Sequence, residues 1–304
     1  LYVMLNTGRG FSALQQWQGA LSAAWANNLQ QQNGETTQFR DINGDGRPDK
    51  LIAVNPANLD ASPNGLYAWL NRNRPLLLTQ ITGSLGERLK IDYAAGPTWG
   101  LHRKASQSAY PAPAIPAGWM VSNIQRDNGL GGFNRINYRY AGARVDLTGR
   151  GYLGLAWEQA TDVSSGLYTE TWYHQNYPLT GMSSRVVSKT TQGKLISDTA
   201  LQYQTRTLNS GRSVFPYLSN KRERRYDLNG DLISDIETSQ KNYDDFGNVG
   251  NVTVVTQAGG QRFVKINNNS YTNLTGDWHL GRLTRSSVRH EQYLNGRLLD
   301  RITR

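Results

Sequence analysis

Short stretches in which apolar and polar residues alternate account for most of this chain, and turn-forming residues separate them. TTQF (36–39), KLIAV (50–54) and VTVVTQA (252–258) are examples, and all three are rich in β-branched or aromatic residues. Alternation with a period of two predicts half-buried β-strands. Residues 11–32 differ, because their leucines and tryptophans recur close to the helical spacing and favour an amphipathic insert.

Turn signals join the strands of the second half into hairpins. Asn-Gly pairs at 229–230 and 295–296, and a Gly-Gly pair at 259–260, each stand between two strand-like segments. Such pairs are strong signals of tight hairpin turns. A repeated pattern of glycine, polar residue, Leu and then Leu or Ile accompanies the turns, and its copies are TTQGKLISD (190–198), DLNGDLISD (227–235) and YLNGRLLD (293–300). The sequence therefore predicts a series of long antiparallel hairpins from about residue 185.

A second repeat pairs LYVMLN (1–6) with LYAWLN (66–71). The later copy follows an acidic loop and the strand DKLIAV (49–54), so one unit consists of a loop and two strands. Units of this kind stack side by side as the blades of a β-propeller, each burying a face against its neighbour. We therefore predict an all-β chain that begins with the terminal part of a β-propeller and continues into long antiparallel hairpins.

Composition narrows the class of protein further. The 31 glycines and 16 tyrosines among 304 residues suit a β-rich fold with many turns, and the absence of cysteine excludes disulfides and thiolate metal sites. The net charge of +10 is dispersed along the chain, and the densest basic run, KRERR (221–225), is interrupted by Glu223. Such a run is typical of a solvated strand face, so no nucleic-acid partner is expected. No apolar run reaches the length of a membrane-spanning helix.

The loop RDINGDGRPDKL (40–51) is the strongest candidate for a metal site. Calcium prefers six to eight oxygen ligands at flexible geometry. The predicted ligands are Asp41, Asn43, Asp45, the carbonyl of Arg47, and Asp49. Ile52 stands where an EF-hand requires glutamate, and Pro48 interrupts any helix, so we predict a short calcium loop within a β-hairpin. The alternative is an Asp/Asn/Gly turn that needs no ion.

A similar segment, residues 227–235, offers Asp227, Asn229, Asp231 and Asp235. Leu232 occupies the place of the second loop glycine, and basic residues stand at the position of Asp231 in the other copies of the repeat. We therefore expect a turn here and no metal.

No arrangement of residues predicts catalysis. The four histidines, His102, His174, His279 and His290, are scattered along the chain. Asp244 and Asp245 are adjacent, and neighbouring residues of a strand point to opposite faces, so they do not form an acid/base pair. There is no nucleophile elbow, phosphate-binding glycine loop or cysteine nucleophile. We predict that the chain is not an enzyme.

Several segments resemble known families. The acidic loop resembles the calcium-binding propeller repeats called FG-GAP or integrin-like, and YDDFGNV (243–249) is similar to the tyrosine-aspartate repeat of the Rhs/YD family. Three further segments resemble the middle regions of the B component of bacterial insecticidal toxin complexes and of related virulence-plasmid toxins and secreted Rhs proteins. These segments are LLLTQITGSLGERLKIDYAAG (76–96), VSNIQRDNGLGGFNRINYRYAGARVDLTGRGYLGLAWEQ (121–159) and GDWHLGRLTRSSV (276–288).

The resemblance implies a secreted bacterial protein whose hairpins form a hollow shell around a C-terminal toxin. It divides the chain into a propeller segment with the calcium loop (1–75), a β-rich toxin middle region (76–184) and Rhs-like hairpin repeats (185–304). The implied partners are other segments of the same polypeptide, its toxin and a translocating A component. An alternative hypothesis is a calcium-dependent adhesin or ligand-binding propeller.

Overall fold

The computed structural model describes residues 2–3, 15–16, 36–42, 47–54, 65–71, 76–96, 100–105, 110–114 and 118–304. Within these segments the regular elements are β-strands, apart from one short 3-10 turn at Asn209–Gly211. The predicted all-β class is confirmed. Of the expected amphipathic insert, the structure describes only Gln15–Gln16, which form strand β2, and the rest of the insert lies outside the described residues.

The chain divides into two compact units. The first comprises residues 1–78 with 94–97 and 116–120, and the second comprises 79–93, 98–115 and 121–304. In the first unit, β3 (Thr36–Arg40), β4 (Asp49–Val54) and β5 (Gly65–Trp69) form an antiparallel sheet in sequence order, while β1 (Tyr2–Val3) pairs with β2 (Gln15–Gln16). The acidic loop connects β3 to β4, as predicted for a hairpin.

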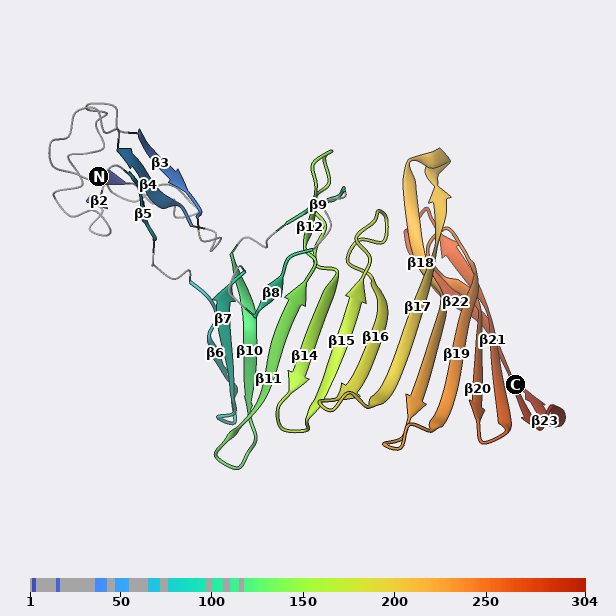
Figure 1. Ribbon diagram of the computed structural model, residues 1–304. Coiled ribbons are helices and arrows are strands. Elements are labelled where there is room, and N and C mark those ends of the chain that lie inside the picture. The colour runs from blue at the N-terminus through green and yellow to red at the C-terminus, as the bar shows by residue number, and fades with distance from the viewer. Residues whose placement is uncertain are drawn as a thin grey trace. The chain divides into compact units, whose positions relative to one another are not determined.

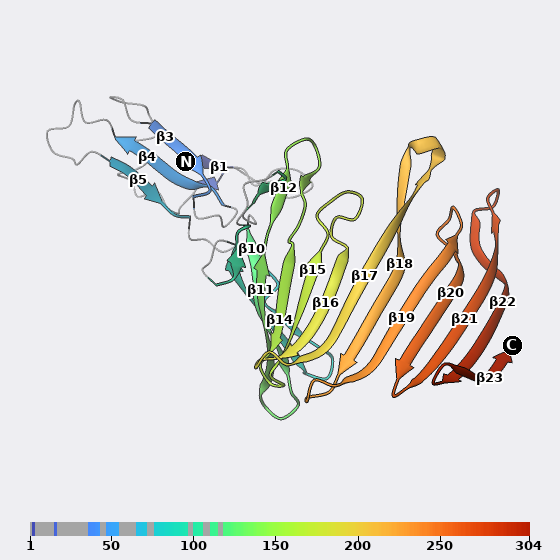
Figure 2. The same ribbon diagram turned by 45° about the vertical axis from the view of Figure 1, so that its right-hand side comes forward.

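One open sheet of 15 strands dominates the second unit. Fourteen strands follow one another along this sheet, and β8 (His102–Arg103) pairs with β11 beside the path. In spatial order the fourteen are β6 (Gln80–Thr82), β7 (Arg88–Ala95), β10 (Trp119–Asp127), β11 (Phe133–Ala141), β14 (Trp157–Asp162), β15 (Leu167–Tyr173), β16 (Ser183–Thr190), β17 (Leu195–Leu208), β18 (Ser213–Tyr226), β19 (Leu232–Tyr243), β20 (Val249–Ala258), β21 (Gln261–Leu274), β22 (His279–Leu294) and β23 (Arg297–Thr303). Figures 1 and 2 show these strands as a twisted single layer.

From β14 onward, consecutive strands are spatial neighbours and pair antiparallel. β16 spans the predicted boundary at residue 185 and pairs with strands on both sides of it, so the sheet is continuous there. The β17–β18 hairpin extends beyond its neighbours (Figures 1 and 2), because residues 203–208 pair only with residues 213–218.

A small apolar core lies near β11 and β14, which are neighbours in the large sheet although β12 and β13 stand between them in the sequence. Here β9 (Ala112–Pro113), β12 (Arg144–Asp146) and β13 (Gly151–Tyr152) form a separate sheet. The Gln175 side-chain amide donates hydrogen bonds to the carbonyls of Gly142 and Gly154, both at 2.8 Å. Buried hydrophobic residues of the described chain gather near this point, and they are Leu101, Tyr140, Ala141, Ala143 and Leu153.

Elsewhere in the sheet, the described residues include only two further buried hydrophobic side chains, Val187 and Val264. Most globular domains bury one face of a sheet against a second layer. Because this sheet buries so little apolar surface, strand pairing and polar side-chain contacts must supply much of its cohesion.

The hairpin turns confirm two of the three predicted pairs and correct the third. Gly259-Gly260 and Asn295-Gly296 are two-residue turns with positive φ at both positions, as tight hairpins require. Residues 227–231 instead form a longer turn between β18 and β19. The Asp227 carboxylate accepts hydrogen bonds from three successive backbone amides of this turn, at 2.8–2.9 Å. Asp227 therefore stabilises a wider loop in which only the glycine adopts positive φ.

Each copy of the glycine repeat also contains a β-bulge. The pairing register shifts so that the second apolar residue of the copy, Ile196, Ile233 or Leu299, has no partner across the hairpin. A bulge inserts an unpaired residue and increases the local twist of the strand. The repeat thus encodes the same irregularity at the start of β17, β19 and β23.

Candidate functional site

One face of the large sheet carries many charged side chains. A row of directly opposed residues crosses four of its strands, with Arg185 on β16, Ala200 on β17, Arg222 on β18 and Glu237 on β19. Directly opposed residues project from the same side of a sheet. We call the side that carries these four residues face A and the other side face B.

Cross-strand ion pairs recur on face A at the same place in every copy of the glycine repeat. The residue five positions after the glycine is Asp198, Asp235 or Arg301. Asp198 accepts two hydrogen bonds from the Arg185 guanidinium, at 2.9 and 2.8 Å. Asp235 binds the guanidinium of Arg222 in the same two-pronged manner. In both pairs the arginine precedes the aspartate by 13 positions in the sequence.

The third copy keeps the pair with the charges exchanged. Arg301 on β23 donates to the Glu291 carboxylate on β22 at 2.8 Å, and Glu291 is buried. This third pair rests on one contact, whereas the two-pronged contacts of the first two copies fix the geometry as well as the charge. The ion pair is therefore a feature of the repeat, and it holds each hairpin in register just beyond the bulge.

The pKa values of the three carboxylates in these pairs lie below their ordinary values. Hydrogen bonding to Arg185 lowers the pKa of Asp198, and hydrogen bonding to Arg222 lowers the pKa of Asp235. The Tyr293 hydroxyl, followed by the charge of Arg301, lowers the pKa of Glu291. All three groups are thus charged at neutral pH, so each copy of the repeat places an ion pair on face A.

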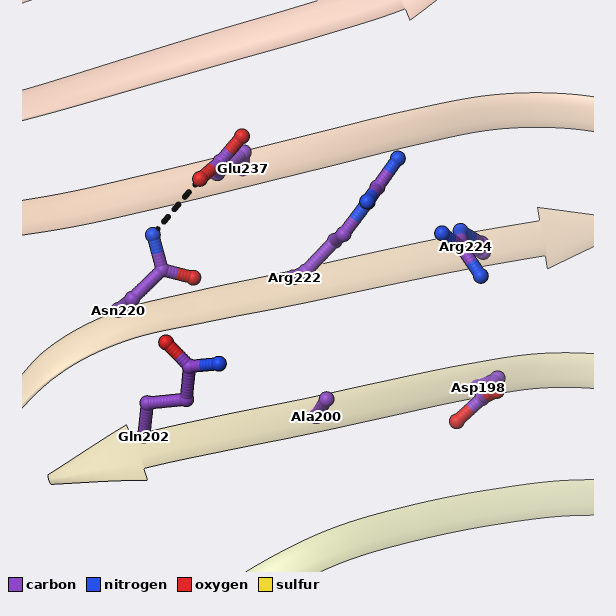
Figure 3. Close-up of a pocket in the computed structure, with 7 residues that line it drawn as sticks. All are labelled: Asp198, Ala200, Gln202, Asn220, Arg222, Arg224 and Glu237. Carbon is purple, nitrogen blue, oxygen red and sulfur yellow. Dashed lines mark hydrogen bonds between the residues drawn. The ribbon is translucent and has the colours of Figure 1, made fainter.

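A hollow of about 330 Å³ opens on face A between these pairs. It lies at Ala200, whose short side chain leaves room between longer neighbours (Figure 3). The residues that line it are Asp198, Ala200 and Gln202 of β17, Asn220, Arg222 and Arg224 of β18, and Glu237 of β19. The Asn220 side-chain amide donates a hydrogen bond of 2.8 Å to the Glu237 carboxylate. No pattern in the sequence predicts this hollow.

The predicted calcium ligands are only partly described. Asn43 and Asp45 lie outside the described residues, while Asp41 is exposed and Arg47 is half-buried. Asp49 is fully buried at the start of β4, where its carboxylate accepts hydrogen bonds from the backbone amides of Ile42, at 2.9 Å, and Asn71, at 2.7 Å. Asp49 therefore ties the loop to the end of β5. The calcium site stays a prediction.

The structure also places the residues considered for catalysis. Asp244 and Asp245 lie in the turn between β19 and β20, so the expectation that they belong to a strand is wrong. Asp244 accepts hydrogen bonds from the backbone amides of Phe246 and Asn248, whereas Asp245 forms an ion pair with Arg206. The two carboxylates are thus engaged by different partners.

The four histidines lie on different parts of the fold. Burial lowers the pKa of His102 on β8, and the ring of His174 packs edge-on against Tyr203 with 5.8 Å between ring centres. His279 and His290 lie on β22. Within the described residues, no three acidic or histidine side chains are arranged to hold a metal ion. Residues 227–235 are all among the described residues. The described part of the chain also contains no helix with the length and apolar character needed to cross a bilayer.

Comparison with known proteins identifies a family and solved structures that are similar to this chain. The model of the insecticide toxin TcdB middle/N-terminal region matches residues 10–181, which is more than half of the chain. A crystal structure of TcdB2-TccC3 without its hypervariable C-terminal region aligns with 97% of this chain at 16% identity and a TM-score of 0.66. A porin-like protein from Bacteroides uniformis aligns with 88% of the chain at 10% identity, but its TM-score of 0.22 carries no structural weight. No curated protein matches the sequence.

The open sheet and its polar face therefore belong to an all-β protein of the toxin-complex class. More specifically, the chain belongs to the family of the insecticide toxin TcdB middle/N-terminal region. It spans 18% of the length of the TcdB2-TccC3 chain. The predicted relationship to the B component of toxin complexes is confirmed.

The Arg185–Asp198 pair makes a prediction about stability. Because the folded pKa of Asp198 lies below its ordinary value of 3.8, its contribution is complete above that value and is lost as the pH falls through the folded pKa. Asp198→Asn should lower the free energy of unfolding by about 0.5–1 kcal/mol at neutral pH, the range of well-placed surface ion pairs. Urea unfolding from pH 7 down to strong acid measures the difference, which should shrink in acid.

Arg185→Met and the double variant complete a thermodynamic cycle for the same pair. The coupling between the two substitutions should equal most of the single-variant loss, since both remove one interaction. A difference between Asp198→Asn and the natural protein that stays constant at every pH would contradict the assignment.

Proposed function

We propose that this chain forms part of the wall of a hollow shell that encloses the toxic polypeptide of a secreted B-type toxin-complex protein. The observation that carries the proposal is the continuous, open sheet of 15 strands, which is a single layer from β14 to β23. A single-layer sheet that buries few apolar side chains can separate two aqueous spaces without closing around an apolar core of its own.

The chemistry of the sheet supports a role in enclosure. Its cross-strand contacts join neighbouring strands to one another, as in the Thr169–Ser188 and Asn251–Asn268 hydrogen bonds of 3.0 and 2.7 Å. The absence of an assembled catalytic group among the described residues agrees with this role. The proposed partners are other segments of the same polypeptide, which continue the sheet, and the enclosed toxin.

The first unit has a separate proposed role. Its three-stranded sheet of β3, β4 and β5 is consistent with one propeller blade, which would present a docking surface for the translocating A component. The toxin-complex family supports this proposal, since a B-type component acts together with other members of its complex.

Electron microscopy of the full-length toxin-complex protein that contains this chain tests the enclosure. We expect a hollow particle with density inside it, and an empty particle of the same outline when the C-terminal toxin region is deleted. A solid particle, or one whose outline changes with the deletion, would contradict the proposal.

We also propose that the acidic loop binds one calcium ion, with a dissociation constant on the order of 10⁻⁴ to 10⁻³ M, as in extracellular modules. Millimolar calcium should raise the melting temperature of the chain, and Asp45→Asn should remove that shift. Asp49→Asn separates the structural role of this ligand from its binding role. Without calcium it should cost about 2 kcal/mol, because the buried carboxylate holds two backbone amides. With calcium the cost should be larger, because Asp49 is also a predicted ligand. If millimolar calcium leaves the melting temperature of the unsubstituted chain unchanged, the site is excluded.

A further inference from the structure

The hollow at Ala200 is electrically balanced. Its lining contains two arginines, Arg222 and Arg224, and two carboxylates, Asp198 and Glu237. Arg222 is already held by Asp235, which Arg224 also approaches at 3.4 Å. Because both arginines have carboxylate partners, the hollow does not concentrate positive charge as a phosphate site does.

Aromatic side chains are also missing from the lining of the hollow, all of which is described. Sugar-binding and base-binding sites use aromatic rings on which a flat apolar face stacks. A carbohydrate or nucleotide therefore has no platform at this site. A ligand that fits must be uncharged overall and must rely on hydrogen bonds.

Two primary amides face the hollow from directly opposed positions. Gln202 on β17 pairs with Asn220 on β18, so both side chains project from face A (Figure 3). Within the described residues, the side-chain amide of Gln202 has no hydrogen-bond partner. Asn220 uses its NH₂ group for Glu237 and leaves its carbonyl oxygen free. The site thus offers one complete donor–acceptor amide and a further acceptor beside it.

The backbone of an extended polypeptide is the chemical complement of such an amide, because the N–H donor and the C=O acceptor of one residue project from the same edge of the strand. We propose that the Ala200 hollow binds the backbone of an extended polypeptide, through the amides of Gln202 and Asn220 and without regard to its sequence. This inference rests on the proposed function, because its occupant is the enclosed polypeptide. It assigns face A as the side that contacts that polypeptide.

The absence of cysteine from the chain makes a face-specific test simple. Ala200→Cys places a single thiol in the hollow, and Thr199→Cys places one on the neighbouring residue of β17, which projects from face B. Each variant of the full chain is labelled to completion with a thiol-reactive photocrosslinker, and circular dichroism checks its fold. The probe is a short uncharged peptide of alternating serine and threonine.

We expect crosslinks to the peptide from position 200 and about tenfold fewer from position 199. Two neutral hydrogen bonds in the hollow should raise the affinity for the peptide by about that factor. Equal yields from the two positions, or a higher yield from position 199, would overturn the inference. Either result would leave the electron-microscopy test of the shell unaffected, so the two proposals fail separately.

Peptide binding to the chain in solution, without any crosslinker, provides a second measurement. N-methylation of alternate backbone amides removes N–H donors and should weaken binding about tenfold, and Gln202→Leu should do the same for the unmodified peptide. Full competition by inorganic phosphate would show that the hollow is an anion site and would overturn the inference. Indifference of binding to N-methylation would overturn it as well.

Discussion

Backbone hydrogen bonds between neighbouring strands are the interaction on which the large sheet depends. In most domains an apolar face packed against a second layer provides the larger part of stability. Here the buried hydrophobic side chains of the described residues gather near β11 and β12, and only Val187 and Val264 are buried in the sheet beyond. Each strand from β15 to β22 is therefore held chiefly by the two strands beside it, as repeats in a solenoid are held by their neighbours.

A sheet held in this way needs devices that fix its register, because a slip of one residue exchanges the two faces. The bulge and ion pair of each glycine repeat provide one such device. The residue five positions after the glycine keeps an ion-pair partner on the neighbouring strand although its charge changes from Asp198 to Arg301. A register fixed at each hairpin also keeps the hollow at Ala200 on the same face as its amides.

Much of the fold follows from local sequence, because strands and tight turns depend on neighbouring residues. Alternation predicted the strands, and Gly259-Gly260 and Asn295-Gly296 predicted their turns. Asn229-Gly230 suggested a tight turn, but the carboxylate of Asp227 stabilises a longer one. The ion pairs were missed although their signal, the acidic residue five positions after two of the repeat glycines, was present. The hollow could not be predicted, since it depends on which side chains three strands bring together.

Hydrogen exchange of the backbone amides tests most directly whether strand pairing holds the sheet together. We predict that amides of the interior strands from β14 to β22 exchange slowly as one continuous block, while those of the outermost strands, β6 and β23, exchange faster. Slow exchange confined to the buried residues around β11 and β12, with rapid exchange through β17 to β22, would contradict the account.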